Sequence, residues 1–262
     1  MRFRLSHDAR PQAITLLVAA IISVLLWFIP YLEILGYPFR LFVTFIHEGG
    51  HALAAVLTGH SVQSLSVSLD TSGLTQREPA GLLANMFISS AGYLGSMAFG
   101  AFLLFLIRKS VKSRFILAAC GVLIAALTVV FGVFTSAFSF EAWSGIPFTL
   151  LAGGIISAGL LLMAKFATKR VATFFVSFLA VQCVLNALLD LKTVFFLSTP
   201  FAPTIPNDAV NMASYTGVPA IFWAAVWIAL ALGILWFAMR LYVAGRDKSY
   251  QPDLPFEETP PI

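Results

Sequence analysis

Charged side chains are scarce in this chain. Only 11% of its 262 residues are Asp, Glu, Lys or Arg, whereas a soluble globular domain carries about 25%. At the same time, 59% of the residues are hydrophobic and 25 of them are phenylalanine. A water-soluble chain of this size could not bury so much apolar surface in one core. The composition therefore excludes a soluble domain and a disordered chain, and it favours an integral membrane protein.

Cysteine is also scarce, and so is any excess of charge. Cys120 and Cys183 both lie inside apolar runs, so we interpret them as small core residues rather than as a disulfide or a metal pair. The net charge is only +4, and the basic residues flank apolar segments, which predicts no nucleic-acid partner. The apolar residues 13–29 are not followed by the A-x-A pattern of a signal-peptide cleavage site, so we expect a retained helix.

Long apolar runs dominate the chain. A membrane-spanning helix needs about 20 predominantly apolar residues. The sequence therefore predicts an all-α polytopic membrane protein with about six to seven transmembrane helices. The candidate segments are 12–30, 40–58, 80–107, 114–135, 146–164, 171–197 and 219–242.

Three segments that lie between or after the apolar runs show other residue patterns. In residues 61–77, apolar and polar residues alternate around a Thr-Ser-Gly turn, which predicts a short membrane-adjacent β-hairpin. Residues 198–218 contain three prolines and no Lys or Arg, so we expect an irregular loop. Residues 246–262 are polar with four prolines and are predicted to be a disordered tail. Residues 1–245 are then a single integral-membrane domain.

Basic residues cluster in the connections at 108–114 and 165–170 and follow the last apolar segment. The positive-inside rule places these connections in the cytoplasm. Seven full spans would then put the arginines of the N-terminus on the opposite side. Either the rule is broken at the N-terminus, or one early segment does not fully cross, and the sequence leaves both possibilities open.

The segment 40–58 differs from the other apolar runs because it contains the pattern H-E-x-x-H at His47, Glu48 and His51. Residues four apart share one face of a helix, so the two histidines can bind one zinc ion, Zn2+. Glu48 lies about 100° round the helix, near enough to take a proton from a metal-bound water. The alternative is an interfacial helix whose polar residues face water. We favour a functional site, because ionisable groups at bilayer depth usually mark function.

Two histidines leave a tetrahedral zinc site short of a protein ligand. Asp190 is our first candidate, because a lone carboxylate in an apolar helix needs a partner. Asn186 lies one turn earlier on the same face and could hydrogen-bond the carboxylate or the substrate. Asp208, in the proline-rich loop, is the second candidate. Glu33 and Glu141 are near helix ends and are expected to face water.

Glycines recur beside the candidate site. Gly49 and Gly50 lie inside the H-E-x-x-H pattern, where each costs roughly 1 kcal/mol of helix stability relative to Ala. They could let a neighbouring helix pack closely, or they could clear space beside the metal, and the two roles are compatible. A second stripe of small residues, Gly92, Ser96 and Gly100, favours helix packing over a direct role in chemistry.

Four of these features together resemble the site-2 protease class, the M50 zinc metallopeptidases that cut within membranes. They are the H-E-x-x-H helix, the following hairpin, Ala91-Gly92-Tyr93, and the Asn186-to-Asp190 motif. The chain looks most like the bacterial M50B-like branch, over most of residues 40–240. The resemblance implies a zinc held by His47, His51 and Asp190 with Glu48 as the catalytic base. It also suggests that Asn186 and Gly92 support the metal or handle substrate.

The chain departs from the family pattern in both motifs. Tyr93 and Ser96 stand where the family has the proline and the asparagine of A-G-P-x-x-N. Leu191 stands where the family has the glycine of L-D-G, and the proline before that motif is absent. Both lie in the motifs that would supply the third ligand and handle substrate.

The leading hypothesis is a membrane-embedded zinc endopeptidase. It would hydrolyse peptide bonds in or near a transmembrane segment of a membrane protein or peptide substrate, within the lipid bilayer of a bacterial cell membrane. The alternative is a non-proteolytic metal-binding membrane protein, such as a transporter or a scaffold. Glu48 separates the two, because only the peptidase needs a general base between the histidines. The sequence leaves the oligomeric state open.

Overall fold

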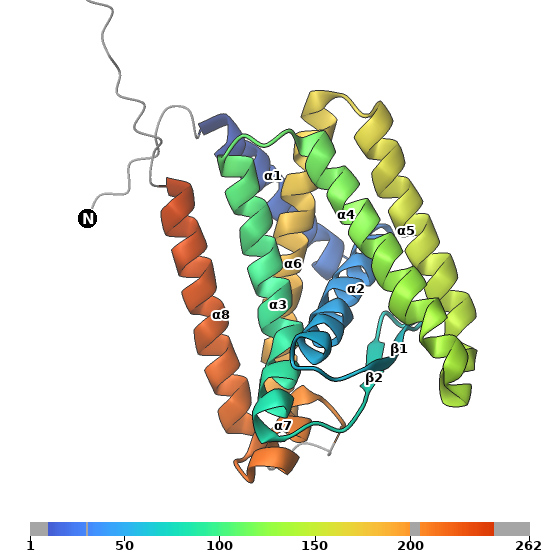
Figure 1. Ribbon diagram of the computed structural model, residues 1–262. Coiled ribbons are helices and arrows are strands. Elements are labelled where there is room, and N and C mark those ends of the chain that lie inside the picture. The colour runs from blue at the N-terminus through green and yellow to red at the C-terminus, as the bar shows by residue number, and fades with distance from the viewer. Residues whose placement is uncertain (1–9, 30, 200–204, 244–262) are drawn as a thin grey trace, which may run out of the picture.

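The computed structural model describes residues 10–29, 31–199 and 205–243. They form a helical bundle with one small hairpin at its side (Figure 1). The predicted tail at 246–262 lies outside the described residues, so the proposed domain division stays a prediction. The elements are α1 (Arg10–Phe28), α2 (Glu33–Leu57), β1 (Val62–Val67), β2 (Gly73–Arg77), α3 (Leu82–Arg108), α4 (Ser113–Leu127), α5 (Ile146–Phe166), α6 (Lys169–Leu197), α7 (Asp208–Thr216) and α8 (Ala220–Val243).

Five helical segments are long and apolar enough to cross a membrane. They are Leu82–Arg108, Ser113–Phe138, Phe140–Phe166, Lys169–Leu197 and Ala220–Tyr242. The second continues from α4 through a π-helical segment, and the third reaches α5 through a 3₁₀ turn. The prediction of an all-α, multi-pass integral membrane protein is confirmed.

The two early helices, α1 and α2, do not each run the full length of the bundle as the five long spans do (Figure 1). The five spans alternate in direction, and α8 ends at the end of the bundle where α1 begins (Figure 1). Since α3 begins at the opposite end, α1 and α2 together make one net crossing. The described chain therefore starts and finishes at the same end, together with the basic α3–α4 and α5–α6 connections. The structure thus supports the second possibility, that one early segment does not fully cross.

The hairpin follows α2, and both of its strands contact the bundle. β1 and β2 are antiparallel, with Leu65 opposite Thr75. Leu65 and Val67 are buried, and the Val67 backbone N–H donates to Thr149 Oγ1 at 3.0 Å. Within the described residues β2 pairs only with β1, so its other edge is unpaired. The predicted membrane-adjacent hairpin is confirmed.

The expectation of an irregular loop over 198–218 is wrong for its second half, which forms α7. The Asn207 side chain accepts hydrogen bonds from the backbone N–H groups of Ala209 and Val210 and so caps the helix. The helix ends at Gly217, whose φ of +70° is a conformation that glycine adopts easily. These capping signals are present in the sequence, but the prolines outweighed them in our interpretation. As a result Asp208 is carried by a short helix rather than by a loop.

We expect the basic end of the bundle to be cytoplasmic. Single cysteines at Lys112 and Glu141, in a variant lacking Cys120 and Cys183, sample the two ends. In intact cells, an impermeant thiol reagent should label Glu141→Cys and spare Lys112→Cys until the membrane is permeabilised. Labelling in the reverse order would invert this orientation.

Candidate metal centre

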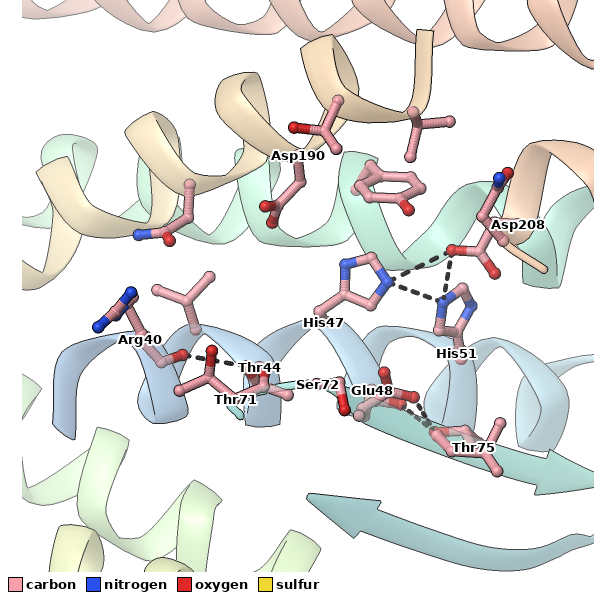
Figure 2. A pocket seen from close by; sticks show the side chains of 18 of the residues that line it. Arg40, Thr44, His47, Glu48, His51, Thr71, Ser72, Thr75, Asp190 and Asp208 are labelled. Carbon is pink, nitrogen blue, oxygen red and sulfur yellow. Dashed lines mark hydrogen bonds and ion pairs between the residues drawn. The ribbon is translucent and has the colours of Figure 1, made fainter. Parts of the chain in front are cut away.

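A polar stripe runs along one face of α2. Arg40, Thr44, His47, Glu48 and His51 follow one another at helical spacing, so their side chains share a face. All five line a cavity of about 510 Å³, which Figure 2 shows from close by. The stripe therefore faces a cavity inside the protein rather than the lipid.

Three side-chain atoms converge at the wall of this cavity. His47 Nε2 and His51 Nε2 lie 3.1 Å apart. Asp208 Oδ2 lies 3.4 Å from the first and 3.3 Å from the second. Zinc bonds of about 2.0–2.1 Å in a tetrahedron require ligand atoms about 3.3–3.4 Å apart. The three atoms thus have the spacing of three corners of a tetrahedral zinc site.

The orientation of His51 also suits a metal ligand. Its Nδ1 lies 2.7 Å from the Ile88 carbonyl oxygen, which can only accept a hydrogen bond. Nδ1 must therefore carry the proton, and the lone pair of neutral His51 is left on Nε2, toward His47 and Asp208. Histidines that bind metals are commonly held by such a second hydrogen bond.

The backbone of α3 leaves room beside the two histidines. A Cβ on Gly92 would collide with His47 Nε2 and His51 Nε2. A Cβ on Gly50 would likewise collide with the Ala91 carbonyl oxygen, so α2 and α3 approach closely at this level. The sequence is compatible with two roles for the glycines of α2, close helix packing and space beside the metal. Gly50 serves close packing, and the space beside the ligand atoms is provided by Gly92.

Glu48 is buried, with 6% of its surface exposed, and it is held by the hairpin. Thr75 Oγ1 donates a hydrogen bond to Glu48 Oε2 at 2.7 Å and lies 3.1 Å from the Glu48 carbonyl oxygen. Gly73, also on β2, packs against the Glu48 side chain, where a Cβ would collide. The carboxylate is therefore fixed on the same helix face as the two histidines. It lies next to His47, His51 and Asp208, which we call the ligand group.

Asp208 is electrostatically matched to the two histidines. Burial by itself would raise the pKa of this carboxyl group, but His51 and His47 outweigh burial and hold the pKa below its ordinary value. Asp208 is therefore ionised at neutral pH, as a metal ligand must be.

The geometry favours our second candidate for the third ligand over our first. Among the described residues, the group that could hold a metal is His47, His51 and Asp208. Asp190 lines the same cavity from α6 but does not belong to this group (Figure 2). Asn186 also lines the cavity, but its amide donates to the Gln182 carbonyl and to Gln182 Oε1. Within the described part of the chain, Asn186 forms no hydrogen bond with Asp190, one of the two roles that we considered for it.

Tyr93, which follows Gly92 in the Ala-Gly-Tyr motif, packs its ring against His47, with the ring centroids 4.6 Å apart. Thr75 and Arg40, which we did not single out from the sequence, also line the cavity. Arg40 shows a signal in the sequence, because it lies seven residues before His47 and so on the same helix face. For Thr75 no local pattern in the sequence predicts the contact with Glu48. Glu33 and Glu141 are exposed, as expected.

A second cavity of about 440 Å³ lies beside the same residues. It shares His51, Thr75 and Asp208 with the first cavity, and it extends along Arg77 and Glu78 of the hairpin side. The ligand group therefore lies between two cavities, with β2 running past both.

A family model described as Peptidase M50B-like matches residues 15–238 of the chain. The matched range includes the ligand group and Glu48. No curated protein matches the chain, and no solved structure matches it.

The ligand group makes a direct prediction about metal content. His47→Ala, His51→Ala and Asp208→Ala should each reduce bound zinc strongly, because each removes one of the three converging atoms. Asp190→Ala is the matched comparison, since it removes a carboxylate from the same cavity. Elemental analysis during a chelator titration of the purified variants measures the effect. If Asp190→Ala empties the site and Asp208→Ala does not, Asp190 is the ligand.

Gly92 provides an independent test. Gly92→Ala should weaken zinc binding by about tenfold or more, because the new methyl group displaces the histidine nitrogens from their positions. The same change should favour the helix by about 1 kcal/mol, so loss of metal would not reflect a weaker helix. Gly95→Ala is the control, because a Cβ there makes only an ordinary contact of 3.7 Å with Gly50 Cα. Equal zinc affinity in both variants would contradict the assignment.

Proposed function

Because this chain belongs to the Peptidase M50B-like family, we propose that it is a membrane-embedded zinc endopeptidase. Its substrate would be a membrane protein or peptide, cut in or near a transmembrane segment. The observation that carries this proposal is the convergence of His47, His51 and Asp208 at tetrahedral spacing. Glu48 lies beside them in the same cavity.

We propose His47, His51 and Asp208 as the zinc ligands. The donor set of two imidazole nitrogens and one carboxylate oxygen is one that zinc uses in peptidases, with a fourth position open. When bound, zinc would polarise the scissile carbonyl group and lower the pKa of a water molecule. The residues of the chain would then position the substrate and move the protons.

Glu48 is the proposed general base. Thr75 holds one of its oxygens, and burial keeps the carboxylate in one place. From there Glu48 could accept a proton from the attacking water and later give it to the leaving amine. A transporter or a scaffold has no use for a carboxylate held this way, so the arrangement favours the peptidase over the alternative.

The unpaired edge of β2 is the proposed substrate track. A peptide bond inside a helix is shielded, so the substrate must be extended where it is cut. Residues 73–75 of β2 line the first cavity and residues 75–77 line the second. An extended segment that adds to this edge would run from one cavity to the other, past Glu48 and the ligand group.

Glu48→Gln separates the proposal from its alternative. The variant should keep its zinc and lose peptide cleavage, because the amide has nearly the same size but cannot accept the proton. The probe is a library of synthetic peptides with apolar segments, incubated with protein in detergent and read by mass spectrometry. Glu141→Gln, at an exposed position, is the control and should cleave like the parent.

Cleavage by Glu48→Gln at the parent's rate would exclude Glu48 as the base. A parent protein that holds zinc stoichiometrically and cleaves no peptide of the library would favour the non-proteolytic alternative.

A further inference from the structure

Arg40 is the member of the polar stripe on α2 whose role the metal centre does not explain. The stripe members after it belong to that centre, apart from Thr44, whose hydroxyl donates to the Thr71 carbonyl oxygen at 2.7 Å. Arg40 lines the same cavity as the ligand group, and Thr44 lies between it and His47 (Figure 2). A positive charge is therefore built into the wall of the cavity in which a substrate would be cut.

The Arg40 guanidinium is held in place by groups that do not compensate its charge. Its Nη2 donates to the Glu33 backbone carbonyl oxygen at 3.2 Å, and its central carbon lies 5.8 Å from the centroid of the Trp27 ring on α1. A carbonyl oxygen and a ring face orient a guanidinium group, but neither carries a full negative charge. A guanidinium group has five N–H donors, and within the described residues a single hydrogen bond uses one of them.

No carboxylate of the described residues forms an ion pair with Arg40. The ion pairs in this part of the chain join Asp208 to the two histidines. Glu33 and Asp70 line neighbouring cavities with Arg40, but both are exposed to solvent. Asp190 lines the main cavity from α6 and is not paired with Arg40 either. The guanidinium can therefore receive an anionic group that comes from outside the chain.

The chain that enters β2 runs beside α2 between Arg40 and the ligand group. Thr71 accepts a hydrogen bond from Thr44, and Thr75 donates one to Glu48, one helical turn further along α2. The proposed substrate track along β2 therefore leads from the ligand group toward Arg40.

The helix geometry of α2 gives the length of this path. Arg40 precedes His47 by seven residues, which corresponds to about 10 Å along a helix. An extended chain advances about 3.3 Å per residue. A substrate residue near Arg40 would thus be about three residues away from the bond that is cut at the ligand group.

We propose that Arg40 is a specificity-determining residue that binds a carboxylate group of the substrate, about three residues from the cut bond. This inference rests on the proposed peptidase function and names the class of its substrates. The carboxylate comes from an Asp or Glu side chain or from the C-terminus of a peptide, and a guanidinium group binds either one through paired hydrogen bonds. A substrate without it leaves the Arg40 charge without a partner inside a membrane protein, which is unfavourable.

The test uses apolar peptides that carry Glu, Gln or Lys at each position in turn. Mass spectrometry of the products gives kcat/KM, and fluorescence anisotropy with zinc-loaded Glu48→Gln protein gives binding without cleavage. At one position, about three residues from the cut bond, the parent should prefer Glu over Gln by about tenfold. The Glu48→Gln protein should bind the same Glu peptide more tightly than its Gln counterpart.

Three variants assign the preference to Arg40, each measured in both assays. Arg40→Gln should remove the preference for Glu, and Arg40→Glu should prefer Lys at the same position. Both should keep their zinc, because Arg40 is not part of the ligand group. Arg170→Gln is the matched control, since it makes the same change at an exposed position at the start of α6 and should keep the preference of the parent.

A further pair of peptides identifies the source of the carboxylate. They end at the preferred position, one with a free C-terminal carboxylate and one with an amide. A preference for the free carboxylate over the amide assigns the Arg40 site to a chain end, and a preference confined to internal Glu assigns it to a side chain.

Equal cleavage and equal binding of the Glu and Gln peptides by the parent at every position would overturn the assignment of Arg40. So would a preference for Glu that persists in Arg40→Gln, or an equal loss of preference in Arg170→Gln. Failure of the peptidase proposal gives a different result. In that case the Glu peptides bind with a preference that depends on Arg40, but the parent protein cleaves none of them.

Discussion

The close approach of α2 and α3 is the constraint on which the site depends. Gly50 meets the Ala91 carbonyl, and one residue further along α3 Gly92 faces both histidine nitrogens. At this separation the Ile88 carbonyl can also hold His51. A side chain at Gly50 would push the helices apart, and a side chain at Gly92 would fill the space beside the ligand atoms. The same packing therefore orients one histidine and leaves room for a metal ion.

The polar stripe of α2 explains the arrangement around it. Ionisable groups are costly in contact with lipid, so this face of α2 must be covered by other parts of the protein. The hairpin covers Glu48 through Thr75, α6 supplies Asn186 and Asp190 to the cavity wall, and α7 brings Asp208. This enclosed helix shares one crossing with α1, and the start of α1 lies at the basic end of the bundle (Figure 1).

The choice between Asp190 and Asp208 as the third ligand shows what can be inferred from a single segment of the sequence. Asp190 was preferred because a carboxylate in an apolar helix needs a partner, and Asp208 was placed second because a loop could expose it to water. Both arguments consider the segment alone. The structure folds Asp208 into a capped helix that packs against α3 and α8, and this places the carboxylate within 3.4 Å of both histidines. Asp190 lies in the same cavity, so both candidate carboxylates line it, and the geometry favours Asp208 as the ligand.

The sequence by itself determined the membrane-spanning helices, the hairpin, the candidate histidines and the candidate base. Each follows from a pattern within one segment: apolar runs long enough for a bilayer, alternation around a turn, or residues spaced by one helical turn. The tertiary structure alone decided that α1 and α2 share one crossing, that Thr75 holds Glu48, that Gly92 provides the space, and that Asp208 meets the histidines. These features depend on distances between segments far apart in the chain, and such distances are set by helix packing, on which the spacing of residues along one segment carries no information.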